Sequence, residues 1–145
     1  MFKHLLLPTD GSEFSASAIQ KGLQFAKAMG ATVTGLYVMP ELHTRSYQAE
    51  VPPDAMERFA RDSKTHAVQV LAVVAEAAKA AGVACDTAYA TNDHPFEAIV
   101  STALAKGCDL IVMASHGRKG IKGFLLGSET QKVLTHSKIP VLVLR

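Results

Sequence analysis

A small-residue loop before a helix near the C-terminal end has the spacing of an anion site. The apolar run 110–113 ends at Ala114, Gly117 follows, and nine residues later come Gly127 and Ser128, where a helical pattern starts. This order predicts a strand, a loop and a helix N-terminus. The first backbone N–H groups of a helix have no intrahelical acceptor and carry partial positive charge, so they can hold phosphate oxygens. We interpret the loop as a candidate phosphate site.

Two observations bear on that interpretation. Ser128 with Gln131 fits a capping box, so a purely structural helix cap is the alternative reading. Charge favours a site, because residues 114–138 hold five basic residues and one acid, whereas the whole chain has 15 Lys and Arg against 13 Asp and Glu. Such clustering is typical of polyanion binding, although solvated surface lysines remain the alternative. The charged residues are Arg118, Lys119, Lys122, Lys132, Lys138 and Glu129.

Composition indicates one globular domain over residues 1–145. Of the residues 48% are hydrophobic and 19% are charged, and the mean hydropathy is +0.15, which excludes an extended disordered chain. The N-terminal apolar run is too short for a signal peptide, and no run reaches the roughly 20 residues of a membrane span. We therefore expect a soluble, cytoplasmic protein without membrane contact. Cys85 and Cys108 lack metal-ligand spacing, so we expect buried free thiols.

The elements that would position this loop alternate along the chain. Predicted strands cover 2–7, 31–38, 83–90, 110–113 and 140–144, and predicted helices cover 12–29, 54–81, a segment from Pro95 to about Gly107, and a segment after Ser128. Alternation of this kind predicts a parallel sheet with right-handed crossovers. The fold class is therefore α/β, a single-domain three-layer sandwich with a five-stranded parallel sheet and helices on both faces, Rossmann-like or adenine nucleotide alpha hydrolase-like.

Ligands of such folds bind at the carboxyl ends of the strands, where the winding reverses. Asp10 follows the first strand; by default it caps the next helix with Glu13, and its alternative role is ligand binding. The segment 39–53 has three prolines and either covers a ligand, with Arg45 reaching in, or is a loose surface loop. We expect the segments after the first, second and fourth strands to converge.

The helix over 54–81 is predicted to start at Asp54 as N-cap and to bury one apolar stripe. That stripe comprises Met56, Phe59, Ala67, Val70, Val74, Ala77 and Ala81. His66 lies close to it, and we expect it to be packed, not catalytic. Asp93 and His94 resemble an acid–base pair, but turns use these residue types routinely, so no catalytic residue is predicted there.

The motifs of several known nucleotide-binding proteins and hydrolases are absent from the sequence, which argues against those classes of protein. The sequence has no GxxxxGK[ST], which excludes a P-loop NTPase, and no GxGxxG after the first strand, which argues against a dinucleotide-binding domain. It has no GxSxG elbow and no evident Ser-His-Asp set. The near-neutral charge and the lack of aromatic residues among the basic ones argue against nucleic-acid binding.

Three segments together resemble the universal stress protein family of the UspA type over essentially the whole chain. They are Lys3-His4-Leu5-Leu6-Leu7-Pro8-Thr9-Asp10-Gly11-Ser12, the stretch from Ile111 to Arg118 with Leu125-Leu126-Gly127-Ser128, and Pro140-Val141-Leu142-Val143. The ATP-binding branch of that family has the pattern G-x2-G-x9-G-[ST]. It falls here on Ala114, Gly117, Gly127 and Ser128, with alanine in place of the first glycine.

The resemblance implies a nucleotide site. Adenine would lie against Pro8, Thr9, Asp10 and the main chain of Val38, and the ribose near Met113 and Ala114. The phosphates would be held by Gly117, Arg118, Gly127, Ser128, Glu129 and Thr130, with Mg or Mn on the phosphate oxygens. The Glu129 carboxylate would repel phosphate unless it points to solvent. ATP is thus the expected cofactor.

Two functions follow from the resemblance. The first is an ATP-binding, dimeric sensor or regulator of the stress response, with at most slow hydrolysis. The alternative is a dimeric interaction module of the same fold that binds no nucleotide. The terminal strand 140–144 is apolar and is expected at a sheet edge, so we predict a homodimer through it. The stress sensed and the downstream protein partner are not specified by these residues.

Overall fold

Strands and helices alternate as the sequence predicts. The computed structural model describes residues 1–42, 51–116 and 125–145. In these residues the elements are β1 (His4–Thr9), α1 (Glu13–Met29), β2 (Thr32–Met39), α2 (Pro53–Ala81), β3 (Cys85–Thr91), α3 (Pro95–Ala105), β4 (Leu110–Ala114), α4 (Ser128–His136) and β5 (Val141–Leu144). Gly30 and Gly82 follow the ends of α1 and α2, as predicted.

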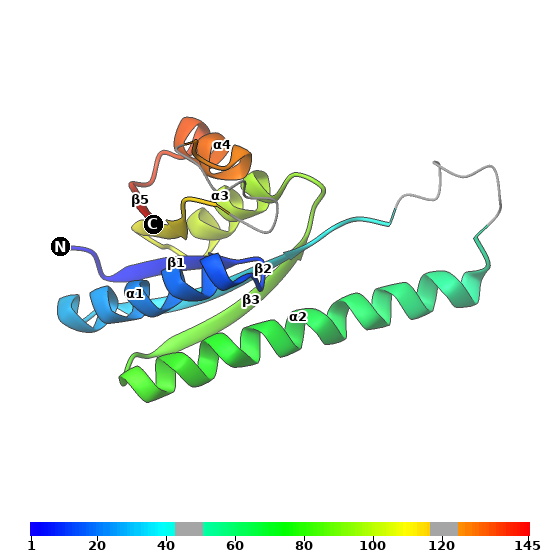
Figure 1. Cartoon of the computed structure of the whole chain (residues 1–145), viewed down its shortest axis with the longest axis horizontal. Coiled ribbons are helices and arrows are strands. Elements are labelled where there is room, and N and C mark those ends of the chain that lie inside the picture. The colour runs from blue at the N-terminus through cyan, green and yellow to red at the C-terminus, as the bar shows by residue number, and fades with distance from the viewer. Residues whose placement is uncertain (43–50, 117–124) are drawn as a thin grey trace.

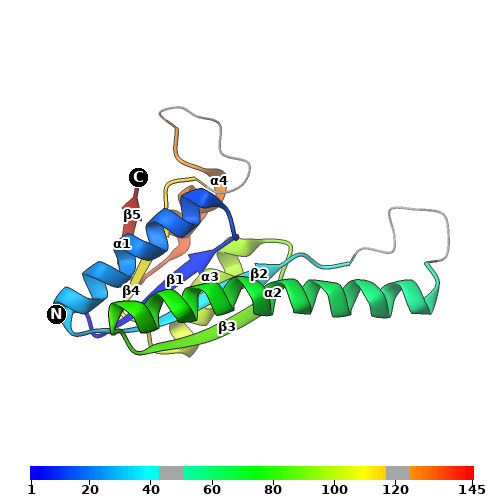
Figure 2. The ribbon, with the colours of Figure 1, turned by 60° about the horizontal axis from the view of Figure 1, so that its bottom comes forward.

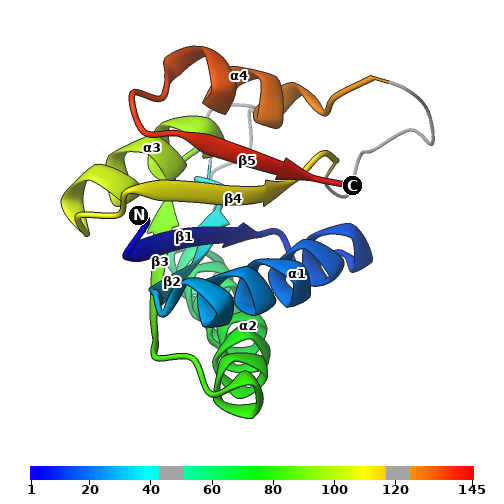
Figure 3. The ribbon, with the colours of Figure 1, turned by 90° about the vertical axis from the view of Figure 1, so that its left-hand side faces the viewer.

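The described strands form one parallel five-stranded sheet in the order β3-β2-β1-β4-β5. The chain runs outward from β1 through β2 to β3, then returns to the other side of β1 for β4 and β5 (Figure 3). The winding therefore reverses between β1 and β4, which is where doubly wound sheets bind ligands. β5 lies at the edge, which confirms the predicted edge position.

Helices cover both faces of the sheet. Figure 1 shows α1 and α2 on one side and α3 and α4 on the other. A hydrophobic core lies on each face of the sheet, and successive residues of β1 point alternately into the two cores. Leu5 and Leu7 pack in the cluster with Leu23 of α1, and Leu6 packs in the cluster with Val133 of α4. A strand covered on both faces needs apolar residues at every position, which explains the uninterrupted apolar run.

One glycine allows α2 to lie close to the sheet. A Cβ added to Gly35 in the middle of β2 would lie 2.9 Å from Cγ1 of Val74 in α2, which is closer than packed carbon atoms approach. Val74 is 4% exposed and belongs to the larger core cluster. The small residue on the strand therefore sets the distance between these two layers.

The predicted apolar stripe of α2 is only partly buried. Of its residues Ala67 and Val74 are buried, whereas Met56 is 40% and Phe59 is 37% exposed. Leu71 and Ala78, which the prediction left out, are buried as well. The reason is length: 29 residues of helix span about 43 Å, and an eight-residue strand spans about 26 Å. The N-terminal half of α2 therefore projects past the strands (Figures 1 and 2).

The start of α2 also differs from the prediction. Asp54 was expected to be the N-cap, but Pro52 occupies that position without a side-chain cap, and the helix begins at Pro53. A proline at the first helical position needs no hydrogen-bond acceptor and has its φ already set for a helix. Asp54 therefore lies inside the first turn, where a carboxylate still interacts favourably with the helix dipole.

A polar contact joins the starts of β1 and β4. The Asp109 carboxylate accepts hydrogen bonds from the backbone N–H of Lys3 at 2.8 Å and of His4 at 3.0 Å. Desolvation raises the pKa of Asp109, but these two hydrogen bonds, a third from its own backbone N–H and the nearby His4 together outweigh it, and the pKa lies below its ordinary value of 3.8. The ionised carboxylate thus holds two neighbouring strands together at the amino end of the sheet.

Candidate functional site

The N-terminus of α4 is held against the end of β4. The backbone N–H of Gly127 donates to the Ser115 carbonyl oxygen at 2.8 Å, and the Gly127 carbonyl accepts the first bond of the helix, from the N–H of Gln131 at 3.0 Å. The Gly127 N–H is thus bonded within the protein, and its predicted contact with phosphate stays a prediction. The next three N–H groups, of Ser128, Glu129 and Thr130, have no intrahelical acceptor and remain as the candidate anion donors.

The absence of a side chain at Gly127 allows a close approach between the N-terminus of α4 and the end of β4. A Cβ built on this residue would lie 3.1 Å from the Ser115 carbonyl oxygen and 3.4 Å from the Cα of His116. The backbone angle φ is −59°, so the need is for close approach, not for a left-handed conformation. The glycine is therefore what lets the helix N-terminus lie directly over the end of β4.

The predicted capping box at Ser128 does not form. Gly127 is the N-cap, Ser128 is the first helical residue, and no side chain caps the helix. The side-chain amide of Gln131 instead donates to the Leu126 carbonyl at 2.8 Å. The backbone bond between Gly127 and Ser115 sets the helix start one residue earlier than the local pattern predicts. Ser128 thus occupies the first turn, with its N–H among the candidate donors.

Ala114 and Thr130 meet behind this helix terminus. The Thr130 hydroxyl donates to the Ala114 carbonyl oxygen at 3.0 Å, and the two residues are 3% and 9% exposed. Among the described residues no residue other than glycine has positive φ. The alanine that replaces the first motif glycine therefore adopts an ordinary strand conformation. Because the Thr130 hydroxyl is engaged, any phosphate contact of this residue falls to its N–H.

A polar cluster follows β1. One oxygen of Asp10 accepts hydrogen bonds from the Ser12 N–H at 2.9 Å and from the Ser15 hydroxyl at 2.8 Å. Ser15 also lies 3.0 Å, oxygen to oxygen, from the buried hydroxyl of Thr9. The predicted Asp10–Glu13 cap is wrong, because Ser12 is the N-cap and accepts from the N–H of Ser15. Ser15, which links Asp10 to Thr9, was not among the predicted site residues.

Pro8 and Val38 lie on neighbouring central strands. Pro8 pairs with Leu36 and Thr9 with Tyr37, so β1 and β2 end at the same edge of the sheet. Val38 is half-buried near the end of β2. Met113 is 7% exposed at the end of β4, the neighbour of β1 on its other side. The three segments that were predicted to converge therefore start from the ends of adjacent strands, β2, β1 and β4.

The Glu129 side chain binds α3. One carboxylate oxygen accepts from the backbone N–H of Phe96 at 3.0 Å, and the other lies 3.0 Å from Nζ of Lys132. The charge is thus offset by a lysine and by the positive end of α3. Glu129 was predicted as a phosphate-binding residue, and only its backbone N–H is oriented by α4 for that role.

Gly117 and Arg118 lie outside the described residues, as do Lys119 and Lys122. His116, the residue just before Gly117, makes two contacts that were not predicted. Nδ1 of His116 lies 2.9 Å from the Ser115 hydroxyl, and Nε2 contacts the Leu125 carbonyl. A carbonyl only accepts, so Nε2 carries the proton, and in the neutral ring Nδ1 accepts from Ser115. His116 thereby links Ser115 to Leu125 across the two ends of the intervening segment.

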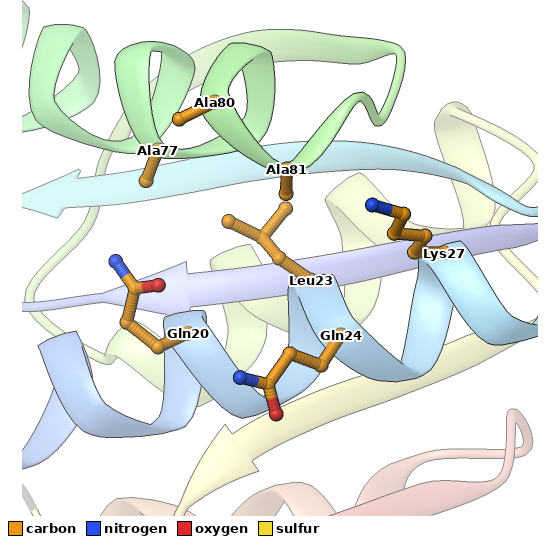
Figure 4. A pocket seen from close by; sticks show the side chains of 7 residues that line it. All are labelled: Gln20, Leu23, Gln24, Lys27, Ala77, Ala80 and Ala81. Carbon is orange, nitrogen blue, oxygen red and sulfur yellow. The ribbon is translucent and has the colours of Figure 1, made fainter.

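Two surface hollows lie near α2. One, of about 320 Å³, lies between α1 and α2, where Ala77, Ala80 and Ala81 face Leu23 and the polar side chains Gln20, Gln24 and Lys27 (Figure 4). The other, of about 370 Å³, is lined by Tyr37, Met39, Pro40, Phe59, Asp62, Ser63 and His66. His66 meets the ring of Tyr37 edge-on, with centroids 5.6 Å apart. His66 thus contacts an aromatic ring but is exposed, so it is not packed in the core as expected.

The thiols differ in burial. Cys108 is buried as predicted, whereas Cys85 at the start of β3 is partly exposed because β3 is an edge strand. Burial raises the pKa of Cys85, and burial together with Asp109 raises that of Cys108 to about 11. Both thiols are therefore protonated at neutral pH and poorly nucleophilic.

The described residues contain no cluster of three or more His, Cys, Asp or Glu side chains placed to hold a metal ion. None of the helices within them combines the length and the apolarity that crossing a bilayer needs.

The fold and the site define a class of protein: a doubly wound α/β protein with a helix N-terminus next to the switch point of its sheet. The sequence profile of the Universal stress protein family matches residues 1–145. The chain belongs to that family. The sequence is 33% identical over 149 residues to the universal stress protein YxiE of Bacillus subtilis, and the match covers 100% of both chains.

Solved structures agree with this assignment. The protein MJ0577 of Methanocaldococcus jannaschii superposes with a TM-score of 0.84 at 28% identity, over 99% of this chain and 96% of that one. A universal stress protein solved in complex with cAMP superposes with a TM-score of 0.73, also at 28% identity, over 99% of this chain and 97% of that one. The predicted family and fold class are thus confirmed.

Proposed function

We propose that this chain is an ATP-binding universal stress protein, a single domain over 1–145 that acts in the cytoplasm as a dimeric, nucleotide-dependent regulator of the stress response. The observation that carries the proposal is the close approach of the Gly127 backbone to Ser115 and His116, where a Cβ would make contacts of 3.1 and 3.4 Å. Three free helical N–H groups follow it. The cAMP complex of a relative with the same fold supports a nucleotide ligand.

The residues of the proposed ATP site fall into two groups, one for adenine and ribose and one for the phosphates. Pro8, Thr9, Asp10 and Val38 lie at the ends of β1 and β2 and would bind adenine and ribose, together with Met113 and Ala114 at the end of β4. The N–H groups of Ser128, Glu129 and Thr130 would bind phosphate oxygens, and Gly117 and Arg118 complete the motif. A Mg or Mn ion would bind the phosphate oxygens. Because no general base is assigned, hydrolysis is expected to be slow at most.

The first experiment is to denature freshly purified protein and to identify the released nucleotide by anion exchange. ATP or ADP at near one per chain would support the proposal. A matched titration compares the wild type with Ser128→Ala, which should bind Mg-ATP about 1 kcal/mol more weakly if its hydroxyl contacts phosphate. Thr135→Ala near the end of the same helix serves as the control. An empty protein that gives no heat with Mg-ATP would contradict the proposal.

The alternative is an interaction module that binds no nucleotide. It is favoured by the projecting half of α2, where Met56 and Phe59 are exposed beside the hollow formed with Tyr37 and Met39. Exposed apolar clusters of this kind often mark contacts with other proteins. Phe59→Ser would then abolish partner binding without changing nucleotide affinity. Under the ATP-binding proposal, loss of the nucleotide motif is instead the change that abolishes function.

We propose that two copies associate through β5. All four residues of this short edge strand are only partly buried, and an apolar edge strand tends to pair with another chain. No nucleic-acid partner is proposed. A sedimentation profile that shows only monomer at micromolar concentration would contradict the dimer.

A further inference from the structure

We propose that Glu129 is a positioning residue, which fixes the N-terminus of α4 by binding the N-terminus of α3. This proposal rests on the proposed ATP site and names the side chain that holds its phosphate-binding helix in place. It would make Glu129 necessary for phosphate binding even though its carboxylate does not face the phosphates.

The first support is the hydrogen bond between the two helix termini. The N–H of Phe96 lies in the first turn of α3, where it lacks an intrahelical acceptor, and it donates to Glu129 at 3.0 Å. Glu129 lies in the first turn of α4. Lys132 binds the second carboxylate oxygen at 3.0 Å and also lies 5.5 Å from the centre of the Phe96 ring. The carboxylate therefore has a partner on each oxygen.

The second support is that Phe96 contacts α4 at both ends. Its backbone binds Glu129 in the first turn, and its ring lies 4.8 Å, centroid to centroid, from that of His136 in the last turn. Two contacts separated by the length of a nine-residue helix fix the direction of the helix axis. Together with the bonds of Gly127 and Thr130 to the end of β4, the contacts with α3 therefore set the direction of the first-turn N–H groups.

The third support is that α3 is tied to the adenine side of the site. The N–H of Asn92, just before α3, donates to the Met39 carbonyl at 2.9 Å, and the Asp93 carboxylate accepts from the N–H of Glu41 at 3.0 Å. Met39 follows Val38 at the end of β2. The contact between Phe96 and Glu129 therefore connects α4, on the phosphate side of the proposed site, to β2 on the adenine side.

Removal of the side chain gives opposite results under the two roles. If the carboxylate only repels phosphate, both Glu129→Ala and Glu129→Gln strengthen Mg-ATP binding. If Glu129 positions α4, Glu129→Ala weakens Mg-ATP binding about tenfold, whereas Glu129→Gln keeps an oxygen acceptor for Phe96 and stays within about threefold of the wild type. Adenosine, which has no phosphate, should bind all three proteins equally.

The matched control is Asp86→Asn. Asp86 also pairs with a lysine, Lys106, at 2.9 Å and accepts a backbone N–H, from Thr87, but it lies on the edge strand β3. Its replacement should change neither Mg-ATP nor adenosine affinity by calorimetry. Amide exchange measured by NMR should accelerate at Phe96 in Glu129→Ala and not in Asp86→Asn.

The outcomes separate this proposal from the proposed function. Wild-type protein that binds neither ATP nor adenosine overturns the ATP site and the positioning role with it. Wild-type protein that binds ATP, with a Glu129→Ala variant of unchanged or higher affinity, overturns the positioning role alone. Equal loss of ATP and adenosine binding in Glu129→Ala would indicate general unfolding and would also overturn it.

Discussion

The Thr130 hydroxyl donates to the backbone carbonyl of Ala114 at 3.0 Å, and both residues are buried. This bond crosses from the first turn of α4 to the last residue of β4. A buried carbonyl that loses its donor costs about 1–3 kcal/mol.

Thr130→Val keeps the shape of the side chain and removes that donor. We therefore expect the free energy of unfolding to fall by about 1–3 kcal/mol in urea titration. Thr135→Val is the control, because its hydroxyl bonds the Gln131 carbonyl on the exposed side of the same helix. Equal stability of the two variants would show that the Ala114 contact contributes little.

Gly127→Ala tests the close approach of α4 to β4. The new methyl group would meet the Ser115 carbonyl at 3.1 Å, a tight contact that a small outward shift of the helix N-terminus would relieve, so Mg-ATP affinity should fall about tenfold. The measurement is calorimetric titration, with circular dichroism to establish that the variant folds. A folded variant of wild-type affinity would contradict the geometry proposed for the phosphate site.

Ala114→Gly restores the glycine of the family motif. Ala114 has an ordinary strand conformation, so we expect Mg-ATP affinity to stay within about threefold of the wild type. Stability should fall by about 0.5–1 kcal/mol because glycine loses more backbone entropy on folding. A large gain in affinity would show that the alanine methyl group obstructs the nucleotide.

Asp109 should make stability depend on acid pH. Its pKa is lowered in the folded state, so its contribution is complete above the unfolded pKa of about 3.9 and is lost as pH falls through the folded value. Asp109→Asn should therefore lower the melting temperature at pH 7 and reduce its decline at acid pH. Glu76→Gln, exposed on α2, is the control. Parallel melting curves against pH for wild type and Asp109→Asn would contradict this assignment.

Val143→Lys tests the proposed dimer. Leu142 and Leu144 pack in one core cluster and Val141 in the other, whereas Val143 belongs to neither, so a lysine there should leave the fold intact. A lysine on an edge strand opposes pairing with a second chain, and we expect a monomer in sedimentation velocity. Val73→Lys, at a 69% exposed position of α2, should remain dimeric.

The fold was predictable because its signals are local. Alternation of apolar strands with helical periods defines a parallel α/β sheet, and the uninterrupted apolar residues of β1 and β4 report burial on two faces. The α2 stripe was only half right, since periodicity shows which face of a helix is apolar but not where the sheet beneath it ends. Met56 and Phe59 therefore fit the stripe and still lie exposed.

The sequence by itself determined the type and order of the elements and the glycine-containing loop before α4, because period, propensity and glycine placement act over a few residues. The tertiary structure decided the rest. Gly127, not Ser128, is the N-cap in a helix start whose backbone N–H binds Ser115, and the Glu129 carboxylate faces α3 because it accepts from the Phe96 N–H, which has no acceptor within its own helix. Such contacts depend on the packing of segments distant in sequence, which no local pattern encodes.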